Sequence, residues 1–89
     1  MVISENPAER AERYIQSFES ALQKNRILFV DSSVKTASIK TFSDALQRYL
    51  KDARYYLESQ KPTTSLASIA YAEGLLDALV YLGLTKPLE

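Results

Sequence analysis

The stretch SLASIAYAEGLLDALVYLG, residues 65–83, decides the fold class of this chain. Its apolar residues recur at three- and four-residue steps, which is the period of an α-helix and not of a β-strand. Thr63 or Thr64 can cap the start of this helix, and Gly83 is a natural left-handed residue at its end. The sequence therefore predicts a helix over about residues 63–82.

A first helix is predicted over about residues 7–25. Asn6 can accept a backbone N–H as the N-cap, Pro7 suits the first helical position, and Glu9 completes a capping-box pattern. An apolar stripe at helical spacing then continues along this segment.

The second helix is predicted over about residues 33–60, with its clearest apolar stripe from Ile39 onward. It ends before Pro62, because a proline disfavours the helical conformation in the residue that precedes it. Since the connection to the next helix is short, we expect the second and third helices to form an antiparallel hairpin. The expected fold is one all-α domain over residues 1–89, a three-helix bundle.

The connection between the first two helices carries a run of four apolar residues, namely Ile27, Leu28, Phe29 and Val30. Such a run can form a short strand, but the sequence offers no evident second strand to pair with it. We therefore interpret it as an apolar loop packed over the bundle.

Composition excludes several classes of function. Eleven basic and eleven acidic residues give zero net charge, which argues against a nucleic-acid partner, and no His or Cys is present. The chain thus lacks the commonest general base and the thiolate ligands of zinc sites, and no cofactor is expected. The start, MVISENPAER, has no signal-peptide pattern, and no stretch reaches the roughly twenty apolar residues of a membrane span. We expect a cytoplasmic protein without a membrane partner.

On a helical wheel, residues 66–82 are apolar around far more than half of the circumference. The predicted core face contains Tyr71, Leu75, Leu79 and Leu82. Its two flanks contain Ile69, Leu76 and Val80 on one side and Ala67, Ala78 and Tyr81 on the other. A three-helix bundle covers about half of each helix, so the surplus predicts self-association or a protein partner.

Gly74 lies in the middle of this helix, where glycine costs about 1 kcal/mol relative to alanine. One interpretation is close packing against another helix of the same chain. The other is close approach of a ligand or a second subunit, which a residue without a side chain permits.

Glu73 and Asp77 occupy a narrow arc of the same helix, which they share with Leu66 and Ala70. The simpler interpretation is a solvated edge, or ion pairs with cations of the chain, namely Arg48, Lys51, Arg54 or Lys86. The alternative is a carboxylate-based metal site, small-ligand site or acid–base site that also uses Asp52 and Tyr71. That alternative requires all of these oxygen atoms to converge on one pocket.

Tyr55 lies off the apolar stripe of the second helix, beside Lys51 and Asp52. An aromatic side chain among charges is either an interface anchor or an incidental surface residue. With Arg48, Lys51 and Arg54, it also suggests a third hypothesis, an accessory domain of a nucleotide- or RNA-handling enzyme. The absence of a basic excess weakens that hypothesis.

Residues 52–84 also carry a pattern of short motifs. The motifs are Asp52-Ala53, Tyr55-Tyr56-Leu57-Glu58, Ala70-Tyr71-Ala72-Glu73-Gly74, Leu76-Asp77-Ala78 and Leu82-Gly83. In these the chain resembles the small archaeal helical proteins classed as the domain of unknown function numbered three hundred and fifty-seven. It departs from them at the turn, where Gln60-Lys61-Pro62 stands in place of a frequent Gly-Asp-Tyr. The resemblance implies a compact three-helix bundle from an archaeal cell interior, and it implies no activity or catalytic residue.

The leading hypothesis from the sequence is a non-enzymatic interaction module that self-associates or binds a protein through its third helix. No catalytic or metal-binding residue is assigned. The candidate ligand or interface residues are Leu66, Tyr71, Glu73, Gly74, Asp77 and Val80 on the third helix, with Asp52 and Tyr55 on the second.

Overall fold

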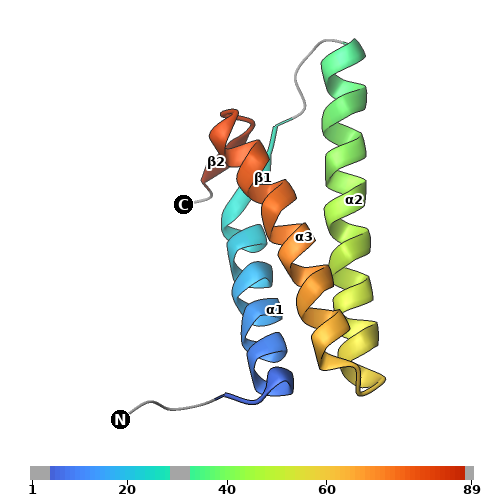
Figure 1. Cartoon of the computed structure of the whole chain (residues 1–89). Helices are drawn as coiled ribbons and strands as arrows, with labels where there is room; N and C mark the ends of the chain where they lie inside the picture. The colour runs from blue at the N-terminus through green and yellow to red at the C-terminus, as the bar shows by residue number, and fades with distance from the viewer. Residues whose placement is uncertain (1–4, 29–32, 88–89) are drawn as a thin grey trace.

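The computed structural model describes residues 5–28 and 33–87, which form three helices and two short strands (Figure 1). The elements are α1 (Pro7–Lys24), β1 (Asn25–Ile27), α2 (Ser33–Glu58), α3 (Pro62–Tyr81) and β2 (Thr85–Pro87). α3 packs most extensively along α2 and also against α1, while α1 and α2 contact each other least. The predicted all-α three-helix bundle, with α2 and α3 as an antiparallel hairpin, is confirmed.

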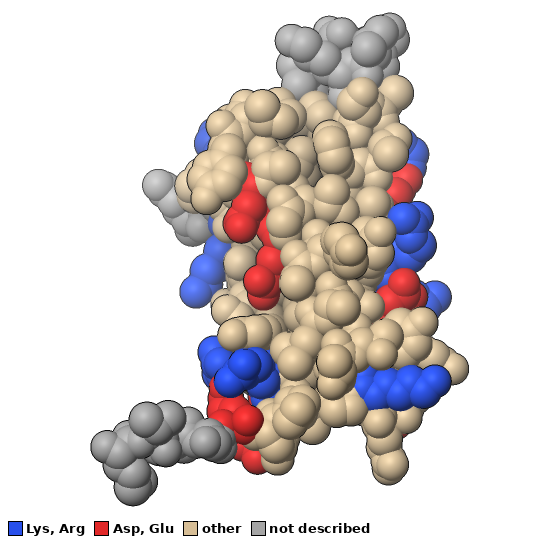
Figure 2. All heavy atoms as spheres, viewed as in Figure 1, with Lys and Arg blue, Asp and Glu red and all other residues tan. Residues whose placement is uncertain are grey.

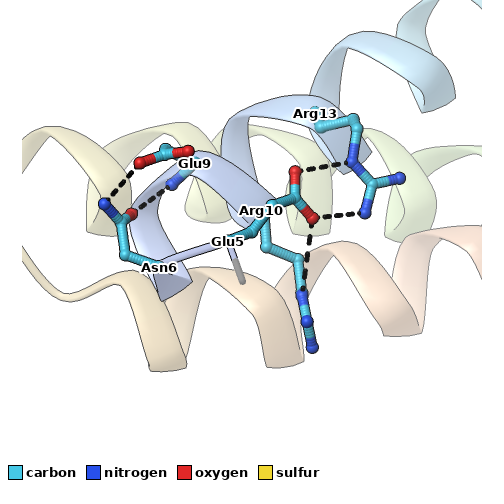
Figure 3. Close-up of polar contacts among 5 residues, drawn as sticks. All are labelled: Glu5, Asn6, Glu9, Arg10 and Arg13. Atoms are coloured by element: carbon cyan, nitrogen blue, oxygen red, sulfur yellow. Dashed lines mark hydrogen bonds and ion pairs between the residues drawn. The ribbon is translucent and has the colours of Figure 1, made fainter. Parts of the chain in front are cut away.

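The start of α1 has the predicted cap (Figure 3). The Asn6 side-chain oxygen accepts a hydrogen bond from the Glu9 backbone N–H at 2.8 Å, and Pro7 opens the helix. The Asn6 side-chain amide in turn donates to the Glu9 carboxylate at 2.6 Å. The first bond satisfies a backbone N–H that would otherwise be left unpaired at the helix end, and the second links the two side chains of the cap.

Glu5, the residue before this cap, is linked through its side chain to Arg10 and Arg13 of α1 (Figure 3). Its carboxylate accepts two hydrogen bonds from the Arg13 guanidinium, at 2.9 and 2.7 Å, and lies 3.8 Å from Arg10 Nε. The hydrogen bond from Arg13 and the two positive charges lower the pKa of Glu5 below its usual range.

The contact between α2 and α3 is made by small residues. Ser65 Oγ donates a hydrogen bond to the Ala53 carbonyl oxygen at 2.6 Å, and both residues are fully buried. A serine side chain reaches the backbone of a neighbouring helix only where the two helices lie close together. Ser68 and Ala72 continue this small, buried strip along α3.

Larger side chains flank the small strip and form the core. The buried residues that pack into one cluster are Ile15 and Phe18 of α1, Leu46 and Ala53 of α2, and Ile69, Ala72, Leu76 and Leu79 of α3. Because α3 contributes half of them, it is the element that joins the other two helices into one domain.

The predicted core face of α3 is wrong in its rotation about the helix axis. Tyr71 and Leu82, both placed in the core, are 64% and 66% exposed. At 100° per residue, the observed inward side is turned by roughly 70° from the predicted one. The helical wheel favours the largest apolar side chains, whereas close packing on α2 places the small residues inward.

The expectation of an apolar loop after α1 is also wrong. Residues 25–27 do not form a loop, because β1 pairs antiparallel with β2, with Arg26 opposite Lys86. The Gly83 residue, at φ 72°, turns the chain back so that β2 supplies the partner strand. Leu28 N–H donates to the Leu84 carbonyl at 2.8 Å, and Phe29 and Val30 lie outside the described residues.

The start of α3 also differs from expectation. Lys61 is the N-cap and Pro62 opens the helix, so Thr63 and Thr64 lie inside it and no side chain caps it. Before it, α2 ends where Gln60 adopts a left-handed φ of 62° and Lys61 N–H donates to the Tyr56 carbonyl at 2.7 Å. This backbone turn makes the tight connection of the hairpin.

The core assignment predicts different costs for two leucines of the same segment. Leu79→Ala, at a fully buried position, is expected to lower the free energy of unfolding by about 2–5 kcal/mol through a lost contact and a cavity. Leu82→Ala is the matched control and is expected to change it by less than about 0.5 kcal/mol. Urea unfolding at low protein concentration measures both, and equal costs would contradict this core.

Candidate functional site

The side of α3 that faces away from α1 and α2 is uncharged except for Asp77 at its edge toward α1. Its residues, called here the open face, are Ala67, Ala70, Tyr71, Gly74, Ala78 and Tyr81. All are exposed except Ala78, which is half-buried, and Tyr81 is 86% exposed. Figure 2 shows this side: the surface over the middle of α3 is free of charge, acidic side chains lie along its α1 flank, and basic and acidic side chains lie along the outer edge of α2.

Gly74 is at the centre of the open face. Among the described residues, a Cβ atom added there would meet no side chain and no other helix within 4 Å. Its interpretation as a close-packing residue within the bundle is therefore wrong, because Ser65, Ala53 and Ala72 perform that role. Within the monomer the glycine only weakens the helix, by about 1 kcal/mol relative to alanine.

An aromatic pair joins the open face to α2. The rings of Tyr71 and Tyr49 stack with centroids 5.3 Å apart and an interplanar angle of 25°. The Arg48 guanidinium lies over the Tyr49 ring, 5.5 Å from its centroid. Arg48, Tyr49 and Tyr71 therefore form a continuous row along the α2 flank of α3.

An acidic groove lies on the other flank of α3, toward α1. Glu73 and Asp77 border a cavity of about 250 Å³ with Leu76 and with three residues of α1. The α1 residues are Ser17, Phe18 and Ala21. Glu73 is half-buried here and Asp77 is exposed, so the first carboxylate packs against the apolar wall and the second remains in water.

The groove changes the titration of Glu73. Burial, followed by the negative charge of Asp77, raises the pKa of the Glu73 carboxyl above its usual range. Within residues 5–28 and 33–87, neither acid forms an ion pair with any of the four cations considered from the sequence. Nothing there offsets the repulsion between the two carboxylates.

Arg54, one of those four cations, pairs instead with Glu19 of α1. The pair borders a second cavity, of about 310 Å³, between α1 and the end of α2. Glu12 and Glu58 also line that cavity. Arg54 therefore belongs to a mostly acidic surface and lies apart from the row formed by Arg48, Tyr49 and Tyr71.

The oxygen atoms proposed for a ligand site lie in two places. Glu73 and Asp77 border the α1 groove, whereas Tyr71 stacks on α2, and Asp52 is a half-buried α2 residue that does not line the groove. In the described part of the chain, no three carboxylate, imidazole or thiol groups are placed to hold a metal ion. The arrangement offers a pair of carboxylates and no converging ligand set.

The remaining candidates are Val80 and Leu66 on α3 and Tyr55 on the outer side of α2. Val80 is 44% exposed, and Leu66 is half-buried. Tyr55 is 63% exposed and packs edge-to-face on Tyr56, with ring centroids 5.4 Å apart. These side chains add apolar surface and no chemically reactive group.

Sequence reasoning missed the pairing of Tyr71 with Tyr49. Both residues are eleven positions from Gln60, one before it and one after it. In an antiparallel hairpin, residues at equal distances from the turn lie side by side, so this spacing was the available signal.

Residues 13–85 match the model of a family described as "Protein of unknown function (DUF357)". The chain belongs to this family. No curated protein and no solved structure matches it in the same comparisons. The DUF357 match thus covers β1, α2, α3, most of α1 and the first residue of β2, and it includes every residue of the open face. Over the described segments, no helix is long and apolar enough to cross a membrane.

The raised pKa of Glu73 predicts how the stability of this DUF357 protein depends on pH. Because the folded state holds the Glu73 proton more tightly than the unfolded state, stability falls as the pH rises from the unfolded pKa through the raised folded pKa. Glu73→Gln is expected to reduce this fall. Urea unfolding at low protein concentration between about pH 4 and 7 measures it, with Asp44→Asn as a control at an exposed acid of α2. An unchanged pH profile for Glu73→Gln would contradict the assignment.

Proposed function

We propose that this DUF357 protein is an interaction module that self-associates through the open face of α3. The observation that carries the proposal is Gly74, a destabilising residue at the centre of an uncharged helix face that no part of the chain covers. A glycine in that position removes the side chain that would hold another backbone away.

The side chains around Gly74 are of the kind that stabilise protein interfaces. Tyr71 and Tyr81 are largely exposed, and aromatic residues are enriched in the centres of interfaces, where each buries on the order of 150–250 Å². The small residues Ala67, Ala70 and Ala78 leave room for a second helix between these rings. Val80 and Leu82 add apolar surface near the end of the helix.

The available area suits a small dimer. A stable interface buries about 800 Å² per partner, which is roughly an eighth of the 6372 Å² surface of the chain. The 20 residues of α3 extend about 30 Å at a width of about 10 Å, so α3 presents roughly 300 Å² and the neighbouring surface of α2 has to supply the rest. A second copy of the chain is therefore a sufficient partner.

Gly74→Arg tests this proposal. The Cβ atom of the new side chain has open space around it, so the variant is expected to fold and to be at least as stable as the original. It places bulk and charge at the centre of the open face and is expected to remain a monomer up to about 1 mM, where the original chain forms dimers. Sedimentation equilibrium over a concentration series measures both.

The matched control is Gln47→Arg, which adds the same side chain elsewhere. Gln47 is exposed on α2 and lies seven residues before Arg54, hence on the flank that faces α1. This variant is expected to dimerise like the original chain. An original chain that is monomeric at every concentration, or a Gly74→Arg variant that dimerises equally well, would overturn the proposal.

A further inference from the structure

The two flanks of the open face carry different charges. The α1 flank carries Glu73 and Asp77, which are adjacent and form no ion pair in the described segments. The α2 flank carries Arg48, which lies over the ring of Tyr49, and Tyr49 in turn stacks on Tyr71. Arg48 is exposed and, among the same residues, also forms no ion pair.

A face-to-face dimer of α3 has two symmetric orientations. If the two-fold axis runs perpendicular to the helices, they are antiparallel, and the acidic flank of one copy lies over the acidic flank of the other. If the axis runs along the helices, they are parallel, and each acidic flank lies over the Arg48 flank of its partner. The antiparallel orientation brings the four carboxylates of the two copies together. The parallel orientation brings carboxylates opposite arginines.

We propose that two copies pair with their α3 helices parallel, so that Glu73 and Asp77 of each copy face Arg48 of the other. The proposal rests on the self-association proposed above and adds its orientation and its charged contacts. Packing of the open faces supplies the affinity, and the charges select one orientation against the other.

The heights of these groups along α3 agree with the parallel orientation. Tyr49 stacks on Tyr71, so Arg48 lies at about the same position along the α3 axis as Tyr71. Glu73 is two residues further along this axis, which corresponds to about 3 Å. In a parallel pair with Gly74 opposite Gly74, equal residues have equal heights. The partner's Arg48 then lies within about one turn of Glu73, whereas Asp77, six residues beyond Tyr71, is about 9 Å further along and is the more distant of the two acids.

Asp52 is the acid of the α2 flank that most needs consideration. It is four residues from Arg48 in the direction of the hairpin turn, which corresponds to about 6 Å along α2. In the parallel pair this height matches Leu66 and Ala67, which carry no charge. Asp52 therefore does not face the acids of the partner.

Cysteine cross-linking distinguishes the orientations, because the chain contains no Cys. Ala70 and Ala78 lie one turn on either side of Gly74. In the parallel pair, Ala70→Cys and Ala78→Cys are each expected to form disulfide-linked dimers alone. In an antiparallel pair centred on Gly74, they cross-link only when mixed, because each is about 12 Å from its own equivalent. Gln47→Cys is the control that is expected not to cross-link.

Charge reversal tests the contacts themselves. Arg48→Glu and Glu73→Arg are each expected to weaken dimerisation on the order of tenfold at low salt, and the double variant is expected to regain most of the loss. Circular dichroism verifies that each variant is folded, and sedimentation measures the dimerisation. The differences are expected to shrink at high salt.

The outcomes separate this inference from the proposed function. Two results would overturn the parallel arrangement and leave self-association through α3 intact. One is cross-linking only when Ala70→Cys and Ala78→Cys are mixed. The other is an Arg48→Glu, Glu73→Arg double variant whose dimerisation is weakened by the sum of the two single losses. Absence of any dimer of the original chain would overturn both.

Discussion

The hydrogen bond from Ser65 to the backbone of Ala53 determines the arrangement of this molecule, because it fixes which side of α3 faces inward. It is formed between two small residues, Ser65 of α3 and Ala53 of α2, that are both fully buried. Once Ser65 is inward, the helical period carries Ile69, Ala72 and Leu76 inward with it. The same rotation turns Tyr71 toward Tyr49, Glu73 toward α1 and Gly74 toward solvent.

This rotation accounts for the uneven surface of α3. A helix so rich in apolar residues buries its leucines and isoleucine well, since Ile69, Leu76 and Leu79 are almost completely enclosed. The surplus that remains outside consists mainly of alanine, glycine and tyrosine, with the aliphatic side chains of Val80 and Leu82 exposed near the end of the helix. Such a surface allows another helix to approach closely. We therefore propose that its partner is α3 of a second copy of the chain.

Much of the fold follows from local rules. The cap formed by Asn6 and Glu9, the helix end before Pro62 and the reversal at Gly83 each follow from the conformational preference of one residue type. The rotation of α3 does not, because the wheel ranks side chains by size and contains no information on how closely two helices approach. The strand pairing of residues 25–27 was missed for a related reason, since its partner β2 follows α3 by only a few residues and carries no strand signal.

The most direct test of this account measures which side of α3 meets water in the monomer. A soluble paramagnetic agent broadens the NMR signals of methyl groups that it can approach. Ala70 and Ala72 are two positions apart on α3, and the first is exposed while the second is fully buried. At low protein concentration we predict strong broadening of the Ala70 methyl signal and almost none of the Ala72 methyl signal. Equal broadening of the two, with the Tyr71 ring protected, would contradict the account.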